Sequence, residues 1–329
     1  GPAQRIGAAA LPVDPYDLAD WRDGDFVLSN GSAAVIVSDV GPGQVYDPYG
    51  GRVIGLAAVE AGALVAPADY NLLLSGIGRY GLATEAVGVL SDGSDGGPAV
   101  VRATGRLTAV RALADLLDAI LPGDFTGFPA AIDYALRPDA DVLEVTMFVR
   151  TGPRGLRAAL GTMQVFFQAY RTPAWRPGIG FGDAAGALPY LAFEDSDSTS
   201  FAWLGPEGVL LNPLFGTSGG DIFTSGALAV GPCGEAELPV GRLAIGGPGL
   251  AGVQRVVAGL EGTVSRNVAG SVTNADGSPA TDVRVHVLTS DGEHLTRFFP
   301  ASDGSFSIEV DARAAALSAW RAGQPVVGP

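Results

Sequence analysis

The sequence predicts an all-β (mainly β) protein, with a large β-sandwich domain, one or two short helices and a smaller β-sandwich after it. The clearest support lies in residues 131–151, where two runs of alternating apolar and polar residues flank Pro138-Asp139-Ala140-Asp141. Alternation with a period of two is typical of strands with one buried face, and Pro and Asp favour the turn between them. The 48 glycines and 23 prolines fall between apolar runs, as turns between many short strands. No long helical blocks alternate with these runs, which argues against a doubly wound α/β fold.

Composition divides the chain into three parts. Residues 1–20 are rich in Ala and Pro without a clean period, and we interpret them as a lead-in segment. Residues 21–262 carry most of the strand pattern and form the expected large domain. A glycine-rich shift at residues 246–252 precedes a smaller sandwich over residues 266–329, in which repeated Asp-Gly turns set the register of short strands.

The large domain begins with the strongest short hairpin signal, an Asn30-Gly31 turn between two apolar runs. A helix is expected over residues 109–121, because Val110, Leu113 and Leu117 share one face and a Pro-Gly pair follows. Strands are expected at residues 53–59, 83–90, 99–105, 132–136, 142–149, 160–170, 188–193, 200–204, 208–214 and 222–230. Residues 235–245 are expected to form a closing pair of strands.

The small domain has strand patterns over residues 270–273, 283–288, 295–299 and 305–310. Residues 311–322 are rich in alanine and have the propensity of a helix. We instead expect a loop and a last strand over 317–320, because the sandwich would otherwise lack a closing strand.

Charge and cysteine usage exclude several classes of function. The formal net charge is −15 and all twenty basic residues are arginine, so nucleic acid and anionic membrane surfaces are unsuitable partners. No run reaches the roughly 18 apolar residues of a membrane span. The single cysteine, Cys233, cannot form an internal disulfide, and the only histidines, His286 and His294, lie in the other domain. We therefore interpret Cys233 as a small, half-buried apolar residue.

The ends of the sequence suggest a piece of a longer, exported bacterial protein. Gly1-Pro2 resembles the remnant that a processing protease leaves, and Pro325–Pro329 adds no closing element. We expect that a signal peptide has been removed and that the protein is periplasmic, an outer-membrane lipoprotein or extracellular.

Two resemblances agree with this expectation. Residues 269–273, Gly277-Ser278-Pro279, 282–287 and 303–308 resemble the carboxypeptidase regulatory-like, transthyretin-like family, which implies a non-catalytic β-sandwich. The large domain, through residues 25–31, 100–107 and 134–139, resembles the β-rich region that precedes the catalytic domain of CehA/McbA-type metallohydrolases of the PHP class. That resemblance implies an accessory region whose metal site would lie in a further domain. A supersandwich of the mutarotase or lyase type is a fold-level analogy.

The sequence contains weak candidates for a metal site. Two histidines eight residues apart cannot supply a zinc or two-metal site, and His286 alternates with apolar neighbours, which indicates the solvated face of its strand. Glu194, Asp195 and Asp197 carry oxygens that suit Ca²⁺, but they lack the spacing of an EF-hand loop. A solvated turn is the preferred interpretation, and no other cofactor is expected.

Carbohydrate is the alternative ligand. Trp175, Phe181, Tyr190 and Trp203 are aromatics that could stack on a sugar ring, although such residues more often fill the edge of a sandwich. Glycoside chemistry also needs two carboxylates about 5–10 Å apart. The candidates by residue type alone are Glu144, Glu194, Glu207 and Asp221.

Three functions therefore stay open. The first is a non-catalytic binding or scaffold region with a carbohydrate or protein partner. The second is a carbohydrate-active supersandwich enzyme or a glycan-binding module. The third is an accessory region that guides substrate to a downstream metallohydrolase domain.

Overall fold

The computed structural model describes residues 3–6, 21–41, 47–110, 123–167, 174–182, 186–194, 198–217 and 220–321. Within these ranges the chain is an all-β protein with one helix, α2 (Gly249–Glu261). The helix expected over residues 109–121 lies outside the described residues, except for Ala109, which ends strand β8, and Val110.

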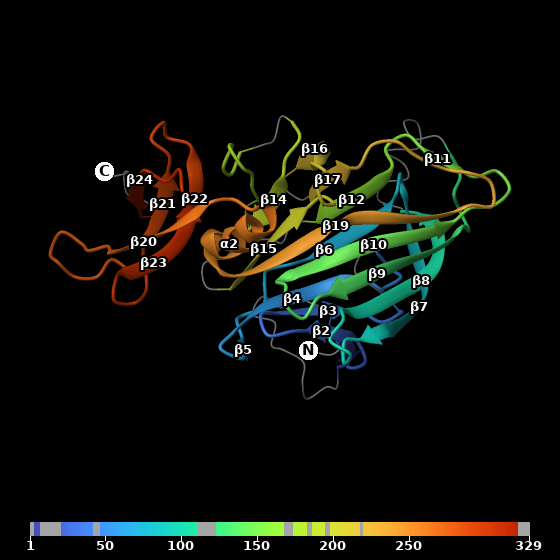
Figure 1. Cartoon of the computed structure of the whole chain (residues 1–329), viewed down its shortest axis with the longest axis horizontal. Coiled ribbons are helices and arrows are strands. Elements are labelled where there is room, and N and C mark those ends of the chain that lie inside the picture. The colour runs from blue at the N-terminus through green and yellow to red at the C-terminus, as the bar shows by residue number, and fades with distance from the viewer. Residues whose placement is uncertain are drawn as a thin grey trace.

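Two antiparallel sheets form the body of the molecule (Figure 1). The smaller sheet has the order β1-β2-β3-β4-β5, with β1 Ala3–Arg5, β2 Phe26–Ser29, β3 Ala33–Val37, β4 Val53–Glu60 and β5 Ala63–Leu64. The expected Asn30-Gly31 turn does join β2 to β3. Residues 3–5 of the expected lead-in segment form β1, which pairs with β2.

The larger sheet contains twelve of the described strands and is strongly curled (Figure 1). Its order is β13-β14-β15-β19-β10-β9-β8-β7-β6-β12-β17-β16. A small pair, β11 (Leu156–Ala158) with β18 (Leu228–Val230), lies outside it. The strands of the larger sheet have the bounds β6 Leu72–Ile77, β7 Tyr80–Asp92, β8 Ala99–Ala109, β9 Pro129–Leu136, β10 Val142–Arg150, β12 Thr162–Phe167, β13 Ala174–Trp175, β14 Tyr190–Phe193, β15 Thr199–Leu204, β16 Asn212–Thr217, β17 Gly220–Thr224 and β19 Glu235–Pro248.

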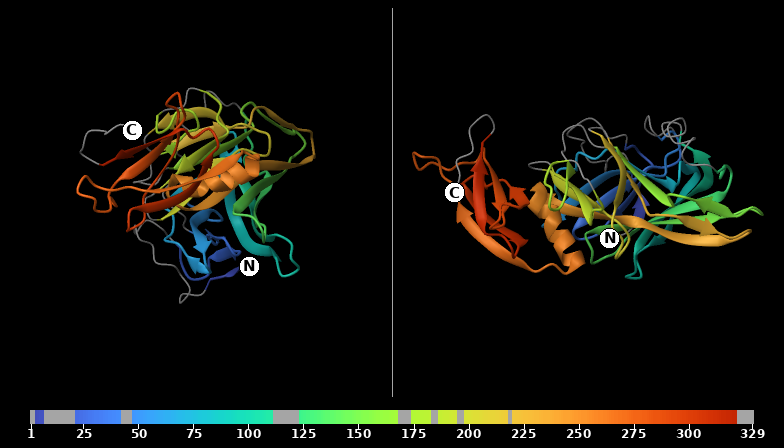
Figure 2. Two further views of the ribbon diagram at one scale, coloured as in Figure 1. Left: turned by 60° about the vertical axis from the view of Figure 1, so that its left-hand side comes forward. Right: turned by 90° about the horizontal axis from the view of Figure 1, so that it is seen from above.

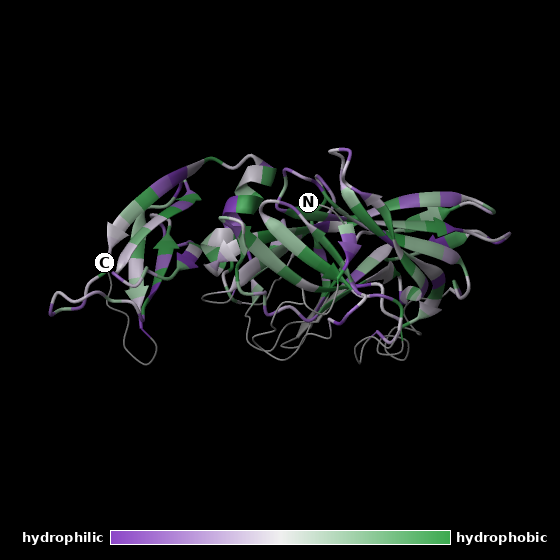
Figure 3. Ribbon diagram, turned by 90° about the horizontal axis from the view of Figure 1, so that it is seen from below, coloured by the Kyte–Doolittle hydropathy of each residue, from purple (hydrophilic) through white to green (hydrophobic). Residues whose placement is uncertain are grey.

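The predicted hairpin over residues 131–151 is strands β9 and β10, at the centre of the larger sheet. Ile132, Tyr134 and Leu136 are buried on one face, opposite Met147, Val145 and Leu143 of β10. This face forms the main hydrophobic core together with side chains of the smaller sheet. Hydrophobic residues accordingly alternate with polar ones along the strands in Figure 3.

At the end of the large domain one expectation is wrong and one helix was not predicted. The expected strand pair over residues 235–245 is one strand, β19, which pairs with β10 and β15 on its two sides. In the glycine-rich stretch at 246–252, residues 246–248 end β19 and residues 249–252 begin helix α2, whose buried Leu250, Val253 and Val257 have helical spacing. Three glycines among its thirteen residues lower the helix propensity, which is why the sequence pattern did not reveal it.

The last strands pair with one another and enclose a separate hydrophobic core, at one end of the elongated molecule (Figure 2). We call residues 265–320 the C-terminal domain. The last strand is β24, which confirms the preference for a strand over a helix in this stretch. Its two sheets are β20-β23 and β22-β21-β24, with β20 Ser265–Ser271, β21 Arg284–Leu288, β22 His294–Phe298, β23 Ser305–Asp311 and β24 Ala316–Trp320.

Two further observations concern single features of the chain. Cys233 is exposed, which corrects its interpretation as a half-buried residue, and it lies in a turn with φ of 51°. Among the described residues, no helix is long and apolar enough to span a membrane.

Candidate functional site at the junction of helix α2 and the C-terminal domain

Helix α2 lies between the larger sheet and the C-terminal domain in each view (Figures 1 and 2). One side of the helix packs on β14, β15 and β19, and the other contacts β22 and β23. Polar and aromatic side chains from all three parts meet around it. We call this region the junction.

The carboxylate of Glu194 lies at the centre of the junction. It follows strand β14, is 3% exposed and forms an ion pair with Arg297 of β22, which is 7% exposed. Its second oxygen accepts a hydrogen bond of 3.1 Å from the backbone N–H of Leu250 in the first turn of α2. The residue before the helix, Pro248, supplies no side-chain cap, so Glu194 takes that role from a distant part of the chain. One carboxylate therefore joins the sheet, the helix and the C-terminal domain.

A second connection is a chain of hydrogen bonds through the two histidines. The indole N–H of Trp175 donates to Nδ1 of His294 at 3.0 Å. Nε2 of His294 lies 2.8 Å from Nδ1 of His286. Because an indole nitrogen can only donate, the proton of neutral His294 must be on Nε2, and it is donated to His286. His286 is thus half-buried and hydrogen-bonded, which corrects its assignment to a solvated position.

Burial and neighbouring charges keep both rings neutral. Burial is the main cause that lowers the pKa of His294 to about 4, with smaller effects from His286 and Arg297. The pKa of His286 is also lowered, first by burial and then by the charges of Arg297 and Arg284. A protonated His294 could not accept the hydrogen bond from Trp175, so the neutral state is the one that the junction requires.

The turn that carries Phe181 is held by a buried ion pair. Arg176 bonds to Asp221 of β17 at 2.8 Å, and it donates a second hydrogen bond to the backbone oxygen of Gly182 at 3.0 Å. The ring of Phe181 then packs against Arg297, whose guanidinium carbon lies 3.9 Å from the ring centroid. Aromatic packing of this kind orients the guanidinium that bonds to Glu194.

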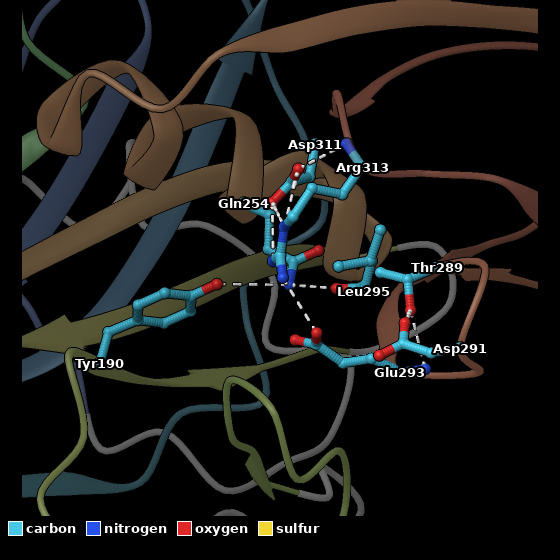
Figure 4. Close-up of polar contacts among 8 residues, drawn as sticks. All are labelled: Tyr190, Gln254, Thr289, Asp291, Glu293, Leu295, Asp311 and Arg313. Carbon is cyan, nitrogen blue, oxygen red and sulfur yellow. Dashed lines mark hydrogen bonds and ion pairs between the residues drawn. The ribbon is translucent and has the colours of Figure 1, made fainter.

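A cavity of about 400 Å³ lies beside these contacts, between β14, α2, β22 and β23. Tyr190 and Gln254 form part of its wall, and the amide nitrogen of Gln254 lies 3.4 Å from the hydroxyl of Tyr190 and 2.9 Å from the backbone oxygen of Leu295 (Figure 4). The ring of Trp175 lies 5.8 Å from that of Tyr190. The cavity thus presents an aromatic surface next to an amide.

Arg313 binds two carboxylates that line the same cavity (Figure 4). It bonds to Glu293 at 2.9 Å and to Asp311 at 2.9 Å through separate nitrogens of its guanidinium. Burial tends to raise the pKa of Asp311, but the hydrogen bonds and charge of Arg313 outweigh it and lower that pKa. Asp311 is therefore an ionised hydrogen-bond acceptor at neutral pH, and the same guanidinium holds the side chain of Glu293 beside it.

The structure brings together three of the four predicted aromatics. Trp175, Phe181 and Tyr190 lie at the junction, around His294. Trp203 is fully buried in the main core. Trp175 is only 2% exposed, so its face is covered by protein and of these aromatics Tyr190 and the edge of Trp175 line the cavity.

The predicted carboxylates do not meet in one place. Glu194 is bound to Arg297, and Asp221 is bound to Arg176. Glu144 forms an exposed pair with Arg137 at 3.2 Å, and Glu207 is exposed in a turn. Two of the three predicted calcium ligands, Asp195 and Asp197, lie outside the described residues. Among the described residues, no cluster of three or more His, Cys, Asp or Glu side chains could hold a metal ion.

Sequence reasoning missed the residues that the C-terminal domain and helix α2 contribute. These are Gln254, Glu293, Arg297, Asp311 and Arg313. The one signal available was the spacing of the histidines: a hairpin places His286 and His294 on the same face of neighbouring strands. Nothing in the sequence indicated that this face meets Trp175.

Comparison with known proteins gives a fold-level likeness. No family model matches the chain, and no curated protein matches it. Among solved structures, Slr1438 from Synechocystis sp. PCC 6803 is 13% identical, with a TM-score of 0.39, over 69% of this chain and 97% of that one. A galactose mutarotase-like protein from Clostridium acetobutylicum is 9% identical, with a TM-score of 0.36, over 67% and 94%. A galactose mutarotase related enzyme from Lactobacillus acidophilus is 10% identical, with a TM-score of 0.34, over 67% and 97%. At these values the likeness carries no argument about what this chain binds.

Proposed function

We propose that this chain is a non-catalytic binding region, and that it holds a neutral sugar or a similar polyol in the junction cavity. The observation that carries the proposal is the composition of the cavity wall. Tyr190 supplies an aromatic ring and Gln254 an amide, while Glu293 and Asp311 supply carboxyl oxygens held by Arg313. Sugar hydroxyls need such acceptors and donors, and the apolar face of a sugar ring packs on aromatic side chains.

The charge state of Asp311 favours binding over hydrolysis. A glycosidase needs one carboxylic acid with a raised pKa, which protonates the leaving oxygen. Arg313 instead lowers the pKa of Asp311 and bonds to Glu293 at the same time. Asp311 therefore accepts hydrogen bonds and stores no proton at neutral pH.

The C-terminal domain forms one wall of this site, because Glu293, Leu295, Asp311 and Arg313 all belong to it. We propose that its role is to complete the site and to hold it rigid through the Glu194–Arg297 ion pair. The broader proposal, that the region guides substrate to a metallohydrolase domain in a longer exported protein, rests on the sequence resemblance. Sequencing the intact gene product would test that broader proposal.

Calorimetric titration with a panel of neutral mono- and disaccharides tests the binding proposal. We expect a member of the panel to bind, and Gln254→Ala to weaken its binding about fivefold, because one hydrogen bond contributes about 1 kcal/mol. Gln4→Ala, a change of the same residue type at an exposed position on β1, is the matched control and should leave binding unchanged.

Three results would overturn the proposal. The first is that no neutral sugar binds at concentrations of about 10 millimolar, which is about the weakest affinity expected of such a site. The second is that the wild type and a folded Gln254→Ala variant bind equally well. The third is multiple turnover of a glycoside by the purified protein. The last result would instead support a carbohydrate-active enzyme.

A further inference from the structure

A second cavity, of about 410 Å³, lies on the outer face of the three-stranded sheet of the C-terminal domain. Its wall is built from alternate residues of β21 and from their neighbours on β22 and β24. The lining residues are Arg284, His286, Leu288, Arg297, Ser318 and Trp320. None of them is acidic, although the chain carries 35 acidic residues and 20 basic ones. This site does not depend on the function proposed for the junction cavity.

Arg284 is the unusual group in this cavity. It is half-buried, yet no hydrogen bond or ion pair is formed by its side chain among the residues that the structure describes. Arg154, Arg157 and Arg255 also lack such partners within that part of the chain, but those three are exposed to solvent. The N–H donors of Arg284 are thus available to a ligand that enters the cavity and carries acceptors.

One aromatic contact and its place in the sheet position Arg284. In the register of the sheet it lies directly opposite Trp320 of β24. Its guanidinium carbon is 5.4 Å from the ring centroid of Phe299, which follows β22. Cation–π contacts of this kind restrict the side chain and leave its N–H donors free.

The local charge is positive and comes from Arg284 alone. Arg297 shares the cavity, but its charge is compensated by Glu194. His286 donates no charge, since burial, then Arg297 and Arg284, lower its pKa. One uncompensated cation suits one anionic group, and the net charge of −15 would repel a polyanion such as nucleic acid.

We propose that this face binds a small organic carboxylate, with the carboxylate on Arg284 and the ring of the ligand against Trp320. A guanidinium bonds a carboxylate through two parallel hydrogen bonds, which fixes the orientation of the ligand. Trp320 supplies the apolar contact, and the hydroxyl of Ser318, opposite His286, supplies a further polar group. A hexuronate, which is a sugar ring that carries one carboxylate, has both features.

Titration with three probes tests the proposal: galacturonate, galactose as its neutral counterpart and acetate as the carboxylate without a ring. We expect galacturonate to bind at least tenfold more tightly than either of the others. Arg284→Gln should abolish the preference over galactose, and Arg284→Lys should restore only part of it, because an ammonium cannot form the two parallel bonds. Arg154→Gln changes the charge equally at an exposed turn and should have no effect.

The outcomes separate this site from the junction cavity. Loss of galacturonate binding in Arg284→Gln together with its retention in Gln254→Ala would support the proposal, whatever the fate of neutral-sugar binding at the junction. The proposal is overturned if galacturonate does not bind, if it binds no better than galactose or acetate, or if a folded Arg284→Gln variant binds it as the wild type does.

Discussion

Glu194 and His294 show how individual side chains determine the junction. Both are withdrawn from solvent and both bind groups that come from other parts of the chain. Glu194 is charged and needs a cation and an N–H donor to compensate for the loss of water. His294 is neutral and needs a donor on one side and an acceptor on the other. The junction supplies these partners in the same small volume.

The titration of His294 gives a pH-dependent stability. Its pKa in the folded protein is about 4, below the ordinary value of 6.5. The fold therefore favours the neutral ring, and this preference stabilises the folded protein fully above about pH 6.5. The stabilisation is lost progressively between about pH 6.5 and 4, where the unfolded chain binds a proton and the folded one does not. Below about pH 4 it changes no further. The pKa of His286 is also lowered, so its titration changes the stability in the same direction. Since His294 is only half-buried, we expect a loss of about 2 kcal/mol.

Urea unfolding at pH 7.5, 5.5 and 4.5 checks this expectation. His294→Gln is the comparison variant, because its amide oxygen can accept the hydrogen bond from Trp175 but does not titrate. The Asp and Glu side chains are the same in both proteins and contribute equally to the pH dependence of their stability. The difference between the two pH profiles therefore isolates the effect of His294. Identical profiles would contradict the assignment of a low pKa to His294.

Helix α2 determines the junction at the scale of an element. The helix approaches β19 so closely that glycines form the contact: a Cβ at Gly252 would lie 2.2 Å from the backbone oxygen of Gly247, and one at Gly246 would lie 2.3 Å from the backbone nitrogen of Val253. Packing requires Gly246 on β19 and Gly252 on the helix, and Gly252 is also one of the residues that lower the helix propensity. Tertiary contact compensates for weak propensity here.

Two glycines of this helix therefore respond in opposite ways to the same change. Gly252→Ala should destabilise the protein by about 3 kcal/mol, because the added methyl group overlaps backbone atoms that cannot move separately. Gly259→Ala, where nothing lies within 4 Å of the added Cβ, should stabilise it by about 0.5–1 kcal/mol through helix propensity. Thermal unfolding of both variants measures the contrast. A stable Gly252→Ala variant would show that the helix does not contact β19 in this way.

At the scale of the whole molecule, the Glu194–Arg297 ion pair couples the C-terminal domain to the large sheet. Removing one partner leaves a buried, uncompensated charge, and we expect Glu194→Gln and Arg297→Met each to cost about 3 kcal/mol. The double variant leaves neither charge, so it should be less destabilised than the sum of the single variants. A double-mutant cycle from urea unfolding measures this coupling.

The exposed pair between Arg137 and Glu144 is the control for that cycle. Its atoms are 3.2 Å apart, but both side chains are largely in solvent. The coupling between Arg137→Met and Glu144→Gln should be no more than about 0.5 kcal/mol. Additive effects of the Glu194 and Arg297 variants would mean that the two domains are not joined through this pair.

The prediction of the fold from sequence succeeded where neighbours in the chain are also neighbours in the sheet. The hairpins of β2 with β3 and of β9 with β10 follow from turn residues and from alternation, which act over a few residues. The long strand β19 was taken as a pair because its two partners, β10 and β15, are distant in sequence. Helix α2 was missed because close packing required glycines that weaken its pattern.

The candidate site shows the same division. Its aromatics could be named in advance, since residues such as Trp175 and Tyr190 stand out by residue type. Their partners could not be named, because Arg297, His294 and Gln254 belong to strands and a helix that lie 41 to 119 residues away from the residues they contact. For Glu194, the neighbouring acidic residues indicated a solvated turn, whereas the structure places it in a buried ion pair.

The sequence by itself determined the β class, the local hairpins, the acidic surface and the last strand of the C-terminal domain. Each of these depends on composition or on residues close together in the chain, where propensity and alternation act directly. The tertiary structure alone decided that a helix separates two sets of strands and that Glu194 joins three elements. It also decided that Arg284 faces an open cavity without a carboxylate. These features depend on which distant residues share a volume from which water is excluded, and the order of residues along the chain does not specify that.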